Sequence, residues 1–255
     1  MIKLIINADD FGLNETCSKA IAQAFTENLI SSTTACANGE YIEQAFSLAR
    51  EYGFEDKIGI HINLTEGKPL TDSIKNDAFF CENGEFHGHI NRLKKPTKKQ
   101  LGELKEEVTA QIERLKNIGF TLTHADSHHH IHTDVFFEKI IKDVLFEYGI
   151  NKIRLHRNLG AIKFYKKIVK RFYNNKLHRQ GFITTDKMGA FLDLEKYPDT
   201  LRHSICEIMV HPDFNKSGKI VDRENWDAEG YPIGKELQNI KIYINNCKLI
   251  SYGEL

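Results

Sequence analysis

Two groups of residues in this sequence could bind a divalent metal ion. Asp9 and Asp10 stand side by side after a short apolar run, and two adjacent carboxylates resist burial unless a cation or a proton compensates their charge. The segment HADSHHHIH places five histidines within nine residues: His124, His128, His129, His130 and His132. Neutral imidazole binds Zn, Mn, Fe or Ni readily. Taken alone, the aspartates could instead cap a helix, and the histidines could bind metal adventitiously.

The pattern leaves open which histidines of this segment would be ligands. An extended backbone would put His128, His130 and His132 on one side, whereas a helical backbone would pair His128 with His132, four residues apart. Asp126 precedes them and could orient a ligand imidazole through a hydrogen bond.

Two further histidines occur in apolar runs elsewhere in the chain. His61 lies on the polar face of the alternating run KIGIHINL, where a lone histidine is more often structural. His211 follows the run ICEIMV and precedes a proline, which holds it extended at a strand end. Its ordinary pKa near neutrality suits a general acid, although it could equally be a simple loop residue. Glu207, four residues earlier, could point into the protein interior.

Together these residues could hydrolyse an amide or an ester. One aspartate and two histidines leave open positions on a metal ion, which is the catalytic rather than the structural arrangement. The second aspartate is then free to remove a proton from a metal-activated water, and a histidine across the site could protonate the leaving group.

The elements that must bring these residues together alternate along the chain. Apolar runs predict strands at Lys3–Asn7, Ile30–Ala37, Lys57–Leu64, Thr121–Asp126, Lys152–His156, Ile205–Val210 and Lys248–Tyr252. Helical spacing predicts helices at Glu15–Asn28, Tyr41–Tyr52, Thr97–Asn117, Val135–Tyr148, Phe164–Tyr173 and Lys235–Asn246. This alternation predicts an α/β fold with a mainly parallel sheet, either a closed or partly closed barrel or an open doubly wound sheet. In both, the carboxyl ends of the strands share one face, where active sites gather.

Length and composition favour one ordinary domain that spans residues 1–255. A long loop at about 65–96 interrupts the alternation of strands and helices. Its Phe79, Phe80 and Phe86 could stack on sugar rings or fasten the loop to the core.

Thirty-five basic residues balance thirty-five acidic ones, so no overall electrostatic field attracts nucleic acid or an anionic membrane. Five scattered cysteines, with no secretory signal and no membrane span, predict a cytoplasmic protein with reduced thiols.

Four motifs in this order resemble the YdjC-like carbohydrate deacetylases, which include chitooligosaccharide deacetylase. They are NADDFG (7–12), GIHINLTEGKPL (59–70), THADSHHHIH (123–132) and EIMVHP (207–212), and SSTTACANG (31–39) is also similar to the family's second strand region. The resemblance covers nearly the whole chain. It implies an irregular TIM-like (β/α) barrel related to the polysaccharide deacetylases.

The resemblance also implies an activity and a set of roles. The reaction would be hydrolysis of the N-acetyl group from an oligosaccharide that contains N-acetylglucosamine, such as acetylated chitobiose. One Mg or Zn ion would be held by Asp10, His61 and His128, with Asp9 as the catalytic base and His211 as the general acid. Family members are similar in forming homodimers. If His130 or His132 bound the ion instead, His61 would become a substrate contact.

The substrate is less defined than the reaction. Some relatives act on phosphorylated sugars, and arginine suits phosphate recognition, so we expect Arg154, with Asp126 and His130, to contact a small acetylated sugar at the rim. One rival is another metal hydrolase, a phosphoesterase or an amidohydrolase, but those usually carry an HxH motif after the first strand. The other rival is a non-catalytic sugar-binding protein of the same fold.

Overall fold

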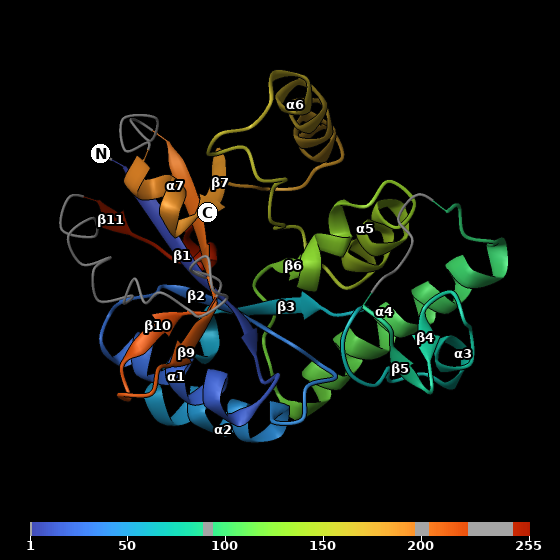
Figure 1. Ribbon diagram of the computed structural model, residues 1–255, viewed down its shortest axis with the longest axis horizontal. Coiled ribbons are helices and arrows are strands. Elements are labelled where there is room, and N and C mark those ends of the chain that lie inside the picture. The colour runs from blue at the N-terminus through green and yellow to red at the C-terminus, as the bar shows by residue number, and fades with distance from the viewer. Residues whose placement is uncertain (1, 89–93, 197–203, 224–246) are drawn as a thin grey trace.

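A parallel sheet forms the centre of the molecule (Figure 1). The computed structural model describes residues 2–88, 94–196, 204–223 and 247–255, and the helix expected at Lys235–Asn246 lies outside these residues. The sheet order is β6-β3-β2-β1-β8-β7, with β11 also paired to β1, and every pairing in it is parallel. The strands are β1 (Lys3–Phe11), β2 (Ser32–Ala35), β3 (Ile58–Ile62), β6 (Ala125–Ser127), β7 (Lys187–Ala190), β8 (Ile205–Val210) and β11 (Lys248–Leu249).

The sheet curls into a half-barrel, so the expected α/β class is confirmed while full closure is not shown (Figure 1). The run expected as a strand at Lys152–His156 forms only isolated bridges, between Ala125 and Ile153 and between Lys152 and Ile183. The sheet is therefore continued beyond β6 by single pairs of residues rather than by full strands.

Most expected helices are confirmed, with shifted ends. They are α1 (Glu15–Thr26), α2 (Ile42–Tyr52), α4 (Lys98–Ile118), α5 (Glu138–Glu147) and α6 (Phe164–Arg179). A further short helix, α7 (Phe191–Lys196), was not expected. Local sequence explains several ends. Asn14 caps α1 by accepting from the Cys17 N–H, and Thr97 and Gln100 form a capping box on α4. Gly53 ends α2 in the left-handed conformation.

The long segment between β3 and α4 contains short elements of its own: α3 (Asp72–Lys75) and a hairpin of β4 (Cys81–Glu82) and β5 (Glu85–Phe86). Buried Glu107 of α4 anchors this segment by accepting from the backbone N–H groups of Leu70 and Thr71. Phe79 and Phe80 are buried and contact Phe137. Of the two alternatives for these rings, fastening the loop to the core is the one that the structure confirms.

One buried hydrophobic cluster runs from Leu4 to Ile220 and joins the sheet to the surrounding helices. In the parts of the chain that the structure describes, no helix combines the length and the apolar character needed to cross a bilayer.

Gly59 of β3 is required by a close approach of His124. A Cβ at Gly59 would lie 2.5 Å from His124 Nδ1 and 2.6 Å from the His124 carbonyl oxygen. We predict that Gly59→Ala lowers the free energy of unfolding by about 1–3 kcal/mol, because the added methyl overpacks a buried strand. Chemical denaturation measures this change.

Gly102→Ala is the matched control, since nothing lies within 4 Å of a Cβ at this position in α4. It should stabilise the protein by roughly 0.5–1 kcal/mol through helix propensity. Equal effects of the two substitutions would contradict the packing argument.

Candidate active site

The register of the sheet brings the expected site residues to one edge. His61 pairs with Asp126 across β3 and β6, and Ala8 pairs with Val210 across β1 and β8. Asp9, which follows Ala8 within β1, and His211, which directly follows β8, therefore lie at the same end of the sheet.

Asp10 lies at the centre of this edge. Its Oδ1 is 3.3 Å from His61 Nε2 and 2.9 Å from His128 Nδ1, and its Oδ2 accepts from Arg223 Nη2 at 2.5 Å. The β1–β2 register shifts between Ala8 and Phe11, and Asp10 has a positive φ of 70°, a conformation that is strained for a residue with a side chain. The irregular strand turns Asp10 towards the two imidazoles.

His61 is oriented by a second carboxylate. Its Nδ1 lies 2.6 Å from Asp126 Oδ1, so a proton on Nδ1 leaves Nε2 facing Asp10. Burial alone lowers the pKa of His61, but Asp126, Asp10 and Asp9 outweigh it and raise the pKa to about 10. A site that stabilises a positive charge this strongly is suited to a cation.

His128 follows β6 in a short 3₁₀ helix (His128–Thr133) and is oriented in the same way. Its Nδ1 faces Asp10, and its Nε2 lies 2.9 Å from Glu66 Oε2. Burial lowers the pKa of His128, but the hydrogen bonds to Asp10 and Glu66 outweigh it, so the pKa is raised. Glu66 was not among the expected site residues.

Unlike Asp10, Asp9 pairs with Arg154. Arg154 Nη1 and Nη2 donate to the two Asp9 oxygens, each at 2.6 Å. Burial raises the pKa of Asp9, but the charge and hydrogen bonds of Arg154 outweigh it and hold the pKa well below its ordinary value. Asp9 is therefore ionised at any physiological pH.

Arg154 does not lie at an exposed rim as expected. It is fully buried, and besides Asp9 it contacts Asp126 Oδ2 at 2.7 Å and Glu207 Oε1 at 2.7 Å. Glu207 also accepts from Tyr252 Oη at 2.5 Å. Arg154 and Asp126 are both fully buried and bound to protein groups, and their expected contact with a substrate stays a prediction.

His211, which directly follows β8, faces Asp9, with Nε2 3.8 Å from Asp9 Oδ2. Asp222 of the β9–β10 hairpin (Pro212–Phe214 and Ile220–Asp222) accepts from the His211 backbone N–H at 3.1 Å, and its Oδ1 lies 3.8 Å from His211 Nδ1. The imidazole is thus between two carboxylates on the same edge as the metal-binding residues.

The histidines that follow His128 differ in their surroundings. His129 and His130 have positive φ values of 51° and 56°, which turn the chain sharply after His128. His132 is buried, with Nδ1 2.5 Å from Ser127 Oγ. Burial, together with the nearby charge of Arg154, lowers the pKa of His130 to about 3, so His130 is neutral beside the site.

These residues fit a divalent cation by their chemistry. Asp10, Cys36 and His61 each offer a ligand atom within 4.8 Å of the other two, and so do Asp9, His61 and Asp126. The expected ligand His128 touches the same Asp10 oxygen. Cys36, which sequence reasoning missed, stands at the end of a predicted strand, and that position was the signal available to find it.

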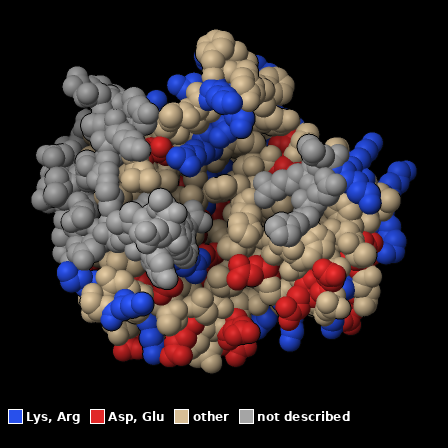
Figure 2. Space-filling view, viewed as in Figure 1, with Lys and Arg blue, Asp and Glu red and all other residues tan. Residues whose placement is uncertain are grey.

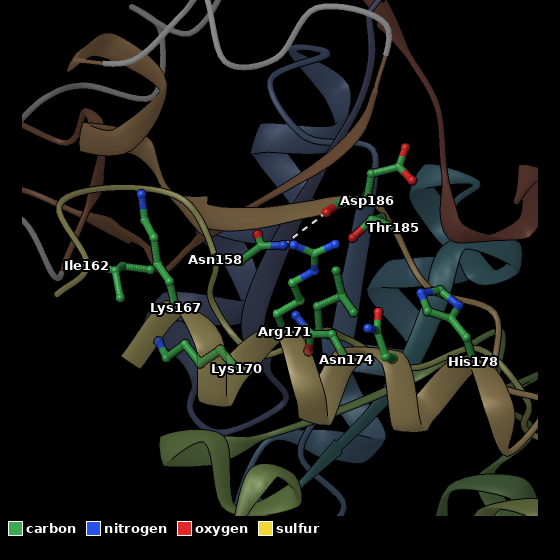
Figure 3. Close-up of a pocket in the computed structure, with 11 residues that line it drawn as sticks. Asn158, Ile162, Lys167, Lys170, Arg171, Asn174, His178, Thr185 and Asp186 are labelled. Carbon is green, nitrogen blue, oxygen red and sulfur yellow. Dashed lines mark hydrogen bonds between the residues drawn. The ribbon is translucent and has the colours of Figure 1, made fainter. Parts of the chain in front are cut away.

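A separate cavity of about 300 Å³ lies beside α6. Figure 3 shows Arg171 of this helix beside Asn158, whose side-chain amide donates to the Asp186 carbonyl oxygen, and Lys167 and Lys170 further towards the start of the helix. Figure 2 shows Lys and Arg side chains gathered over α6, above a hollow in the middle of this face. The cavity offers positive charge that the chemistry above does not use.

Comparison with known proteins gives consistent matches along the chain. The family described as "YdjC-like protein" matches residues 3–239. A protein named carbohydrate deacetylase from Clostridium beijerinckii is 28% identical over 100% of both chains. One of the same name from Geobacillus stearothermophilus is 33% identical over 82% of this chain and 78% of its own.

Similarity also extends to a solved structure. A crystal structure from Enterococcus faecalis, whose protein is named for cellobiose-phosphate cleavage, has a TM-score of 0.75. The two chains are 23% identical, and the match covers 99% of this chain and 98% of the other. At this identity the likeness establishes the fold alone.

We predict that Arg154→Met lowers the free energy of unfolding by about 3–5 kcal/mol at neutral pH, because it leaves buried carboxylates without their cation. The deficit should shrink as the pH falls, since protonation removes the charges of Glu207 and then of Asp9. Denaturation curves at several pH values measure both effects.

Arg157→Met is the matched control. Arg157 is partly exposed and pairs with Asp193 at 2.7 Å, so its loss should cost less than about 1 kcal/mol. Equal losses of unfolding free energy in the two variants would show that the buried ion pairs of Arg154 stabilise the protein no more than a surface pair does.

Proposed function

This chain belongs to the YdjC-like family, and on that premise we propose that it is a metal-dependent hydrolase that removes the N-acetyl group from an N-acetylated sugar. One observation carries the proposal: Asp10 contacts both His61 and His128, while the adjacent Asp9 pairs with Arg154. A cation site and an ionised carboxylate therefore lie side by side. The names of the curated relatives, carbohydrate deacetylases, support a sugar substrate.

Asp10, His61 and His128 would hold the ion, either Mg or Zn. A divalent ion bound there polarises the acetyl carbonyl and makes a bound water more acidic. Asp126 and Glu66 fix the outer nitrogens of the two imidazoles, which keeps the inner nitrogens directed at the ion.

Asp9 would remove the proton from the attacking water. Arg154 keeps the Asp9 carboxylate ionised and holds its orientation through two hydrogen bonds. Its lowered pKa makes Asp9 a weak base, which suffices because a water on a divalent ion is already acidified. Arg154 thus positions the base rather than binding the sugar.

His211 would give a proton to the departing amine nitrogen. Its ring nitrogens face Asp9 and Asp222, so the carboxylate of Asp222 can stabilise the protonated imidazole until transfer. The products are acetate and a free amino sugar. Neutral His130, near the same edge, is the remaining candidate to contact the sugar.

Further features of the proposal follow the family resemblance. We propose one domain over residues 1–255 with an insertion at about 65–96, an irregular TIM-like barrel, a cytoplasmic location and a homodimer. The substrate would be a small chitooligosaccharide such as acetylated chitobiose, in plain or phosphorylated form. A phosphoesterase, an amidohydrolase or a non-catalytic sugar-binding protein is the alternative.

We predict that Asp9→Asn retains its metal and slows acetate release from N-acetylated chitobiose by about 10²–10⁴-fold, because the substitution removes the base. Elemental analysis and an acetate assay measure the two quantities. Exposed Asp56→Asn should leave turnover unchanged. Undiminished turnover in Asp9→Asn would reject the assigned base. Phosphate release by the wild type would favour the phosphoesterase alternative, and sugar binding without acetate release would favour the binding protein.

We predict that His128→Ala loses stoichiometric metal, because one imidazole ligand disappears from the site. The adjacent, exposed His129→Ala should keep full occupancy by elemental analysis. Full occupancy in His128→Ala would instead move the ligand to a neighbouring histidine.

A further inference from the structure

The thiol of Cys36 lies beside the proposed metal position, although the reaction described above does not use it. Cys36 directly follows β2, whose last residue, Ala35, pairs with Phe11 of β1 and Ile60 of β3. This register sets Cys36 level with His61 on the neighbouring strand. The Cys36 N–H donates to the Phe11 carbonyl oxygen at 2.8 Å, which fixes the backbone there.

The Cys36 sulfur is within reach of a shared cation. One ligand atom from each of Asp10, Cys36 and His61 lies within 4.8 Å of the other two, and all three side chains are buried. Ligand atoms around a four-coordinate zinc-type ion are about 3–4 Å apart, as metal–ligand bonds of about 2.0–2.3 Å require. Small side-chain movements would bring the three atoms to this spacing.

The other candidate group, Asp9, His61 and Asp126, is less suited to a cation. Arg154 already binds both of its carboxylates, at distances of 2.6 and 2.7 Å, so an ion there would face a buried guanidinium. On the other side, Arg223 takes only Oδ2 of Asp10, and Oδ1 faces the two imidazoles. The cation position is therefore the one that Cys36 borders.

We propose that Cys36 supplies a sulfur ligand to the divalent ion held by Asp10, His61 and His128, and that this sulfur makes the site select zinc-type ions over Mg. The inference rests on the proposed function, because it concerns the same metal site. Thiolate is a soft ligand that favours zinc, whereas Mg requires oxygen ligands.

The charge and the coordination number are compatible with this role. The thiol proton passes to solvent when sulfur binds, and the Cys36 thiolate and the Asp10 carboxylate then balance the two positive charges of the ion. With Cys36 as a fourth protein ligand, a water would have to enter as a fifth ligand, an expansion that catalytic zinc sites undergo during reaction.

Cobalt(II) in place of zinc tests the proposal, because a cobalt–thiolate bond gives a near-ultraviolet charge-transfer absorption. Metal-free wild-type protein titrated with Co²⁺ should show this absorption rising to one equivalent. Cys36→Ser should bind one Co²⁺ without the absorption. Its Zn²⁺ affinity should fall by at least about tenfold while its Mg²⁺ affinity changes little.

Cys17→Ser is the matched control, since Cys17 is also buried and its thiol donates to the Asp10 carbonyl oxygen at 3.2 Å. It should keep the absorption. Wild-type protein that binds one Co²⁺ without the absorption would overturn the role of Cys36 and leave the proposed function standing. Wild-type protein that binds no Co²⁺ would overturn both.

Discussion

The buried ion pairs of Arg154 are the interaction on which the carboxyl end of the sheet depends. Its guanidinium binds Asp9, Asp126 and Glu207, which come from β1, β6 and β8. Buried carboxylates cost several kcal/mol each unless a cation and hydrogen bonds compensate them. The guanidinium groups of Arg154 and Arg223 are fewer than the four carboxylates that they bind, and the charges of Asp126, Asp10 and Asp9 raise the pKa of His61. The fold thus prepares a position where a further positive charge is stabilised.

One irregularity in β1 gives the adjacent aspartates Asp9 and Asp10 different contact partners. The register shift between Ala8 and Phe11, with the positive φ of Asp10, turns the two carboxylates in different directions. Asp9 meets Arg154, and Asp10 meets His61 and His128. Strained backbone of this kind persists only where the surrounding structure holds it, and here it turns two consecutive carboxylates towards different partners.

The loop that follows β3 takes part in the site through Glu66. Glu66 holds the outer nitrogen of His128, as Asp126 holds that of His61. Buried Glu107 anchors the same loop at Leu70 and Thr71, so the charge on α4 fixes a segment that reaches the site. Orientation of the two imidazoles proposed as ligands therefore depends on elements well separated along the chain.

The sequence by itself determined the α/β class, the existence of most strands and helices, and the gathering of Asp9, Asp10, His61, His128 and His211 at one edge. Apolar periodicity and the common direction of parallel strands suffice for these inferences, because both act locally or by a general rule. Only the tertiary structure decided that Arg154 is buried beneath the site, that Glu66 and Cys36 border it, and that His132 pairs with Ser127. These outcomes depend on strand register, on two left-handed residues after His128 and on contacts between segments far apart in the chain, none of which a one-dimensional pattern encodes.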